Sequence, residues 1–62
     1  EVRQAISQLP DEQEIVVRMR IYEEKKFAVI AEELGLPLGT VLSRMRAAVM
    51  KLEKSLGRHL YE

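Results

Sequence analysis

Apolar residues recur three or four positions apart along most of the chain, which is the spacing of one face of an α-helix. The pattern stops at Pro10, in the polar stretch 23–26, and around Gly35 and Pro37. Proline fits the first turn of a helix and disfavours helical geometry in the preceding residue, whereas glycine suits the left-handed position after a helix. The predicted helices are a short one ending near residue 8, one over 11–22, one over 27–34, and a last one from beside Pro37 to residue 55 or 56, before Gly57.

The predicted fold class is all-α, with four helices and no winged elements. β-Branched residues are scattered, and alternation of apolar and polar residues is nowhere sustained for the length of a strand. Helices this short are marginal alone, so each must bury its apolar stripe against the others. We expect Tyr22 on the stripe of the second helix. The expected core consists of Leu9, Ile15, Val16, Met19, Ile30, Ala31, Leu34, Leu36, Val41, Met45, Val49 and Leu52.

The length and composition argue against an enzyme. A chain of 62 residues forms at most one small domain, and domains of this size bury only about 60% of their unfolded surface, which leaves little room for a catalytic cavity. The chain has no cysteine, so disulfides and cysteine-based zinc sites are excluded. His59 has no second histidine at ligand spacing, and we expect neither a metal nor a cofactor.

Targeting signals are lacking in the sequence as given. No apolar run reaches the roughly 20 residues that span a bilayer, and the first residues lack the basic and apolar segments of a signal peptide. We therefore expect a cytoplasmic protein. Because the sequence does not begin with Met and opens in an apparent helix, we also expect residues 1–62 to be one domain of a longer chain.

Charge is distributed unevenly, although ten basic residues balance ten acidic ones. Residues 1–35 carry five basic and eight acidic side chains, and residues 36–62 carry five basic and two acidic ones. A partner meets one face of a protein, and the field decays within about 10 Å at ordinary salt, so this asymmetry matters more than the total. Either the C-terminal half meets phosphate or the surface is unevenly solvated, and composition leaves both open.

The segment 27–46 has the pattern of a helix-turn-helix. A small residue, Ala31, permits close approach of two crossing helices, Gly35 accepts the reversal, and Val41 packs the second helix onto the first. The outward face of that second helix then projects into solvent. Helix hairpins that only pack can show the same spacing, so the pattern favours DNA binding without requiring it.

Residues 30–44, which read IAEELGLPLGTVLSR, resemble region 4 of the sigma-70 family of bacterial sigma factors, most closely the extracytoplasmic-function group. The upstream segments Leu9-Pro10 and 17–20 resemble the same region, so the resemblance covers nearly the whole chain. It implies the C-terminal domain of a sigma factor, which recognises the minus-35 promoter element and contacts core RNA polymerase through the β-subunit flap. An anti-sigma factor is a further possible partner.

The candidate DNA-binding residues come from the helical wheel and from this resemblance. With Val41, Met45 and Leu52 inward, the outward arc of the last helix holds Ser43, Arg46, Ala47 and Met50, flanked by Leu42 and Arg44. Arg46 is the first choice for base readout, and Ser43 is either a polar contact or a tolerated small residue. Thr40 lies where a helix N-terminus attracts phosphate, or it only caps the helix.

Other candidates leave alternatives open. Arg44 matches the family's arginine and holds either phosphate or an acid on a neighbouring helix. Arg20 is included on the resemblance alone. Lys26, like its neighbour Lys25, either touches the DNA backbone or is a solvated connector. The predicted DNA-binding set is Arg20, Lys26, Thr40, Leu42, Ser43, Arg44 and Arg46.

Two departures from the family weaken the expected DNA affinity. The family commonly has a basic residue at position 42 and often one at 47, where this chain has Leu42 and Ala47. Leu42 is suited to contact a thymine methyl group, or it forms a protein-facing patch with Met50. The rival interpretation is therefore a sigma-like module that binds a regulator without reading DNA. A third is a response-regulator type of helix-turn-helix, which usually dimerises through its last helix.

Overall fold

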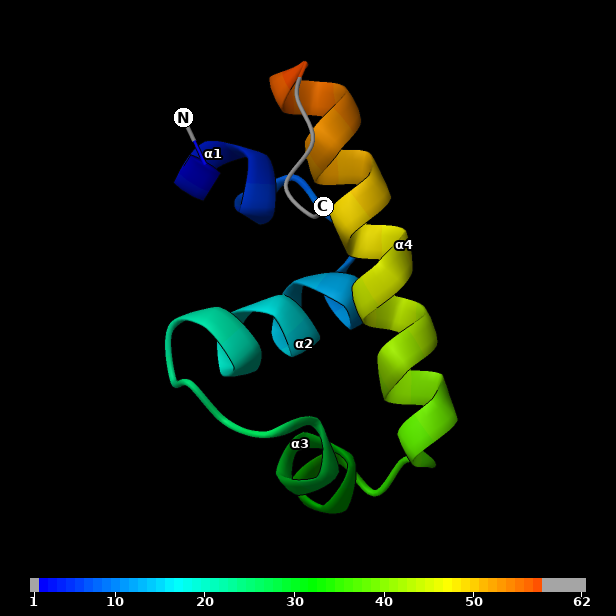
Figure 1. Cartoon of the computed structure of the whole chain (residues 1–62). Coiled ribbons are helices and arrows are strands. Elements are labelled where there is room, and N and C mark those ends of the chain that lie inside the picture. The colour runs from blue at the N-terminus through cyan, green and yellow to red at the C-terminus, as the bar shows by residue number, and fades with distance from the viewer. Residues whose placement is uncertain (1, 58–62) are drawn as a thin grey trace.

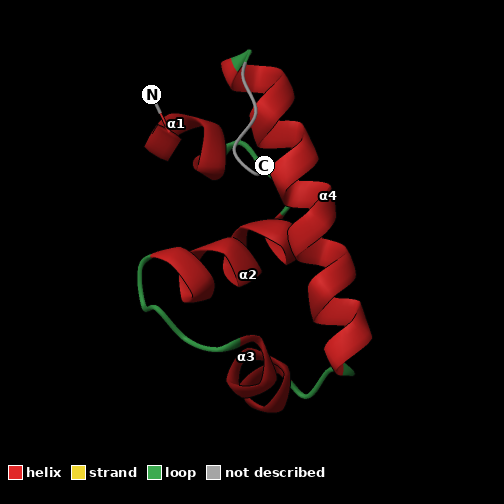
Figure 2. Ribbon diagram, in the orientation of Figure 1, coloured by secondary structure: helices red, strands yellow, loops and turns green. Residues whose placement is uncertain are grey.

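The computed structural model describes residues 2–57, and this part of the chain contains four helices and no strand (Figures 1 and 2). The boundaries agree with the sequence prediction to within one or two residues. The all-α fold class is confirmed. The helices are α1 (Val2–Ser7), α2 (Asp11–Ile21), α3 (Phe27–Leu34) and α4 (Leu38–Leu56).

The longest helix, α4, is the element against which the others pack. It contacts α1, α2 and α3, which follow one another along it from its C-terminal to its N-terminal end (Figure 1). At 19 residues, α4 is roughly 28 Å long, close to the whole 32 Å long axis of the molecule. No helix in the described residues is long and apolar enough to cross a membrane.

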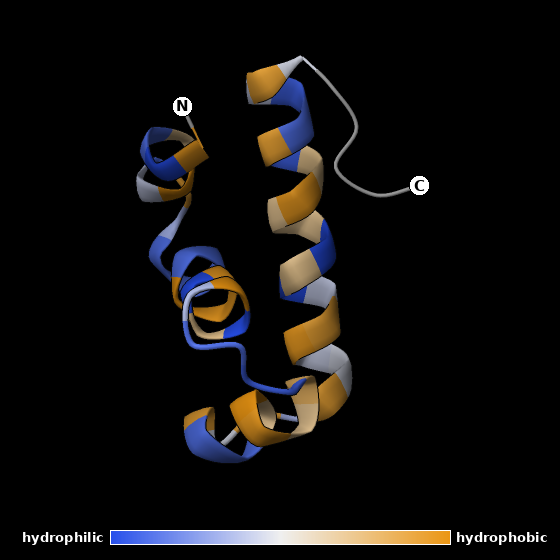
Figure 3. Cartoon of the chain, turned by 60° about the vertical axis from the view of Figure 1, so that its left-hand side comes forward, coloured by the Kyte–Doolittle hydropathy of each residue, from blue (hydrophilic) through white to orange (hydrophobic). Residues whose placement is uncertain are grey.

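One apolar core joins all four helices. Apolar and polar positions recur around α4 turn by turn (Figure 3), and no polar or charged residue among residues 2–57 is buried. Phe27, Leu34, Leu36 and Leu56 pack against the edge of the core and are only partly buried. The buried core consists of Ala5, Ile6, Leu9, Val16, Val17, Met19, Ile30, Ala31, Val41, Met45, Ala48, Val49 and Leu52.

The predicted core is wrong on one face of α2. Ile15 is 44% exposed and Tyr22 is 46% exposed, whereas Val17, which was not expected in the core, is fully buried beside Val16. Helix α2 contacts α1, α3 and α4, so partners on several sides bury consecutive residues. The run Ile15-Val16-Val17 has no helical periodicity, and therefore spacing alone could not show which of its members faces outward.

Candidate nucleic-acid interface

The turn between α3 and α4 fixes the direction of the second helix. Gly35 has the left-handed conformation, with φ 67° and ψ 35°. Its amide donates to the carbonyl of Glu32 at 3.2 Å, and the amide of Leu36 donates to the carbonyl of Ala31 at 2.9 Å. These two bonds form a Schellman motif, which ends α3 without help from side chains. The helix-turn-helix expected from Ala31, Gly35 and Val41 is thus formed.

The N-terminus of α4 has no side-chain cap. Pro37 is the N-cap residue, and its carbonyl accepts the amides of Thr40 at 3.0 Å and Val41 at 3.2 Å. Thr40 lies inside the first turn, half-buried, and does not cap the helix, so that alternative for Thr40 is wrong. The amides of Leu38 and Gly39 have no backbone acceptor within the helix, because they precede the first intrahelical bond.

The two faces of α4 differ as the helical wheel predicts. Val41 is fully buried and Met45 is 5% exposed, so both point into the core. Ser43 and Arg46 are exposed on the opposite side. Within residues 2–57, the Arg46 side chain makes no ion pair. An arginine on a projecting helix face, with no partner among the described residues for its five N–H donors, is suited to read a base edge or to hold a phosphate.

Arg44 bridges α4 to the start of α2. Its Nη2 lies 3.2 Å from Oε2 of Glu12, whose side chain is 73% exposed. Of the two alternatives for Arg44, the structure shows the acid on a neighbouring helix. Because the guanidinium has five donors, this single contact leaves several of them available for a second partner. Because the Arg44–Glu12 ion pair is exposed to solvent, it contributes little to stability, on the order of 1 kcal/mol or less.

Arg20 holds the connector between α2 and α3. Its Nη1 donates to the carbonyl of Lys25 at 3.1 Å, and its guanidinium carbon lies 4.6 Å from the centre of the Phe27 ring. The side chain is only partly exposed. Sequence reasoning, which placed Arg20 at the DNA surface by resemblance alone, missed this structural role; the aromatic residue seven positions later was the available signal.

The neighbouring lysines differ from each other. Nζ of Lys25 is 2.8 Å from a carboxylate oxygen of Glu23 and 2.6 Å from one of Glu33. Hydrogen bonds to Glu23 and then Glu33 raise the pKa of Lys25 above its ordinary value of 10.5. Lys26, in contrast, is exposed and makes no ion pair with any described residue. Only Lys26 keeps its charge available to a partner.

An apolar groove lies beside the outward face of α4. Its volume is about 440 Å³. Leu42 is 43% exposed and Met50 is 64% exposed, so both leave apolar surface uncovered on the same helix as Arg46. A patch of Leu42 and Met50 was one of the alternatives predicted from the sequence, but the contribution of Phe27 from α3 was not predicted. The lining residues are Phe27, Leu42, Met45, Arg46, Val49, Met50 and Glu53.

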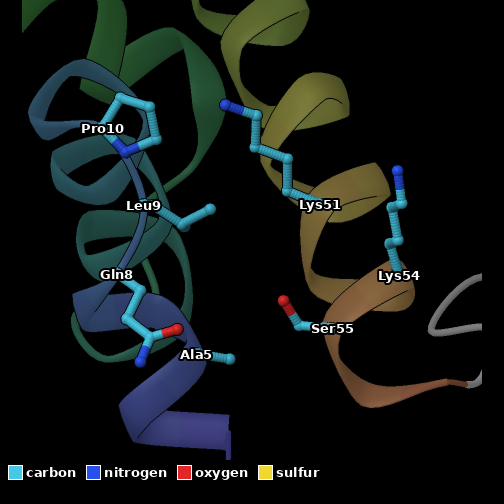
Figure 4. Close-up of a pocket in the computed structure, with 7 residues that line it drawn as sticks. All are labelled: Ala5, Gln8, Leu9, Pro10, Lys51, Lys54 and Ser55. Atoms are coloured by element: carbon cyan, nitrogen blue, oxygen red, sulfur yellow. The ribbon is translucent and has the colours of Figure 1, made fainter.

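A second hollow lies at the other end of α4 (Figure 4). Gln8, Leu9 and Pro10 form one wall, and Lys51 and Lys54 rise from α4 on the other side. Its volume is about 480 Å³. Among the described residues, its lining includes no histidine, cysteine or carboxylate. Among the described residues no group of His, Cys, Asp and Glu could hold a metal, and His59 lies outside them.

The geometry is that of a helix-turn-helix whose second helix presents polar and basic side chains to solvent. A comparison with curated proteins finds no match. The family model described as sigma-70, region 4 matches residues 1–52, from the start of the chain to the last buried residue of α4. The chain belongs to the sigma-70 region 4 family, whose members are DNA-binding, non-enzymatic domains with a role in promoter recognition by sigma factors.

Proposed function

We propose that the chain is the minus-35 recognition domain of an extracytoplasmic-function-type sigma factor, acting in the bacterial cytoplasm. Helix α4 enters the major groove with Ser43 and Arg46 toward the base edges. The observation that supports this most directly is the exposed Arg46, which has no ion-pair partner in residues 2–57. Its geometry allows a bidentate contact to guanine, the commonest specific arginine contact with DNA.

Contacts to the DNA backbone would surround this readout. Thr40 and the first amides of α4 lie at a positive helix end that favours phosphate. Arg44 retains donors beyond its contact with Glu12, and Lys26 is exposed on the N-terminal side of α3. Arg20 would take part only through donors not used within the connector. Such contacts position the domain without specifying sequence.

The protein partners are proposed from the same surface. The Met50 end of the apolar groove, two turns beyond Leu42, suits a protein contact, either with the β-subunit flap of core RNA polymerase or with an anti-sigma factor. The eight acidic side chains of residues 1–35 repel phosphate, so the part of this half that lies away from Lys26 and α3 would face protein rather than DNA. Because the chain is neutral overall, DNA binding by the isolated domain should be weak, and tethering to polymerase would raise the effective concentration.

The test compares one arginine variant with one lysine variant on the same helix. We expect Arg46→Ala to weaken binding of a selected promoter duplex about tenfold to a hundredfold, as lost bidentate base contacts do, and to relax its sequence preference. Lys54→Ala also removes one exposed positive charge, but two turns away beside the α1 hollow, and should change affinity little. Fluorescence anisotropy between 50 mM and 200 mM salt measures both the affinity and its salt dependence.

The rival function is a regulator-binding module without DNA readout. It would be supported if no salt-dependent binding to any duplex were found, or if Arg46→Ala and Lys54→Ala behaved alike. Sedimentation addresses the response-regulator alternative, because a stable symmetric dimer would argue against a sigma-type domain.

A further inference from the structure

The N-terminal half of α4 presents a leucine where hydrogen-bonding side chains would be expected. Leu42 is 43% exposed, although it lies one residue from Ser43 and one turn before Arg46. We propose that Leu42 is a specificity-determining residue that reads the 5-methyl group of a thymine in the major groove. This inference rests on the proposed function, since it requires α4 to enter that groove.

The position of Leu42 follows from helix geometry. Val41, one residue before Leu42, and Met45, three residues after it, are both buried. Their burial fixes the rotation of α4 about its axis. Leu42 and Arg46 are four residues apart and therefore lie on the same side of the helix, about 6 Å apart along the axis. Both line the same groove. If α4 followed the major groove, this separation would correspond to at most about two base steps of 3.4 Å.

The chemistry of leucine leaves one attractive target. Its side chain has no hydrogen-bond donor or acceptor, and the only apolar feature in the major groove is the methyl group of thymine. Opposite guanine or cytosine, Leu42 would cover a carbonyl or amino group that then loses water without gaining a partner. The site should therefore carry an A·T pair within about two base pairs of the guanine that Arg46 reads.

A protein-facing role for Leu42 is the alternative outcome. Met50 shares the groove and is more exposed, at 64%, but it lies two turns further along α4. It is therefore a matched control, because it is an exposed apolar side chain on the same helix and outside the proposed readout segment. If Leu42 served only protein contacts, neither residue would influence how the chain responds to thymine methyl groups.

The experiment removes methyl groups from the DNA. A duplex is selected by the 62-residue chain at 50 mM salt from a pool with a randomised central segment, and each thymine is replaced in turn by deoxyuridine. We expect one replacement to weaken wild-type binding about threefold to fivefold, the effect of losing one buried methyl group. With Leu42→Ala the same replacement should have no effect, whereas Met50→Ala should retain the wild-type response.

A second variant tests the same proposal by replacing the apolar side chain of Leu42 with a basic one. Leu42→Lys should lose the response to deoxyuridine and steepen the salt dependence by about one counterion, because a phosphate contact replaces the methyl contact. Equal sensitivity of wild type and Leu42→Ala at every thymine would overturn the inference while leaving minus-35 recognition intact. Failure to select any sequence would overturn the proposed function itself, and Leu42 readout with it.

Discussion

The two corners on either side of α3 are built in different ways. At the α3–α4 corner, Gly35 adopts φ 67° and two backbone hydrogen bonds close the turn. At the α2–α3 corner, Glu24 adopts φ 54° and is the only non-glycine residue with positive φ among the described residues. There, the side chains of Arg20 and Lys25 hold the connector.

This difference decides which basic side chains are used within the fold and which remain exposed to a binding partner. The α3–α4 corner, closed by backbone hydrogen bonds, uses no basic side chain. Arg46, two turns into α4, makes no ion pair with any described residue and remains available to a partner. The α2–α3 corner is held by the side chains of Arg20 and Lys25, and among the described residues only Lys26 remains unpaired there. The number of basic residues in the sequence therefore overstates how many side chains near the α2–α3 connector are available to contact DNA.

The largest effect is expected for Arg20→Ala. It removes the hydrogen bond to the carbonyl of Lys25 and the cation–π contact with Phe27, and should lower the free energy of unfolding by about 2 kcal/mol. Arg20→Lys keeps the charge but loses the planar fork, so it should recover little of the stability. Urea unfolding measures both variants. Full rescue of stability by lysine would contradict the structural role.

The α3–α4 corner is tested by replacing each of two glycines with alanine. An added Cβ meets nothing within 4 Å at either Gly35 or Gly39, so only backbone conformation distinguishes them. Gly35→Ala forces a side chain into the left-handed region and should cost about 1 kcal/mol. Gly39→Ala, inside the first turn of α4, should be neutral or stabilising by a few tenths of a kcal/mol. Equal effects in thermal melts would rule out this explanation.

A smaller and opposite effect is expected at the other corner. Glu24→Gly relieves the strain of a side chain in the left-handed region and should raise the free energy of unfolding by about 0.5 kcal/mol. The gain is smaller than the strain itself, because glycine also has greater conformational freedom in the unfolded chain. Glu24→Gln, which removes the charge but not the Cβ, is the control. A stabilisation of the same size by glutamine would assign the effect to charge.

The smallest effect is the pH dependence from Lys25. Its raised pKa means that its contribution to stability is complete below pH 10.5 and is lost as pH rises through the higher value of the folded state. Glu33→Gln removes one of its two acidic partners and should make this alkaline loss of stability shallower. Melting temperatures between pH 9 and 11.5 compare the two proteins. An unchanged slope would mean that the ion pair has no energetic role.

Much of the fold is predictable because Pro10, Gly35, Pro37 and Gly57 mark helix ends by backbone geometry, which acts locally. Helix α3 was predicted over its full observed range, 27–34. The buried face of α2 was not predictable, because α1, α3 and α4 together decide which of Ile15, Val16 and Val17 is covered.

The candidate site divides in the same way. The exposure of Ser43 and Arg46 follows from the period of α4 and was predicted. The contacts of Arg20 with the connector and of Arg44 with Glu12 join different segments, and their partners depend on how the helices cross. Sequence spacing contains no such information, so it could not separate these arginines from the freely exposed one.

The placement of α4 in the major groove is tested most directly by following the amide resonances of the isotopically labelled chain while a selected promoter duplex is added. We expect the largest chemical-shift changes at Thr40, Ser43 and Arg46, with small changes at Ala5 and Lys51 beside the α1 hollow. Changes centred on that hollow, with the resonances of residues 40–46 unmoved, would contradict the placement of α4 in the major groove.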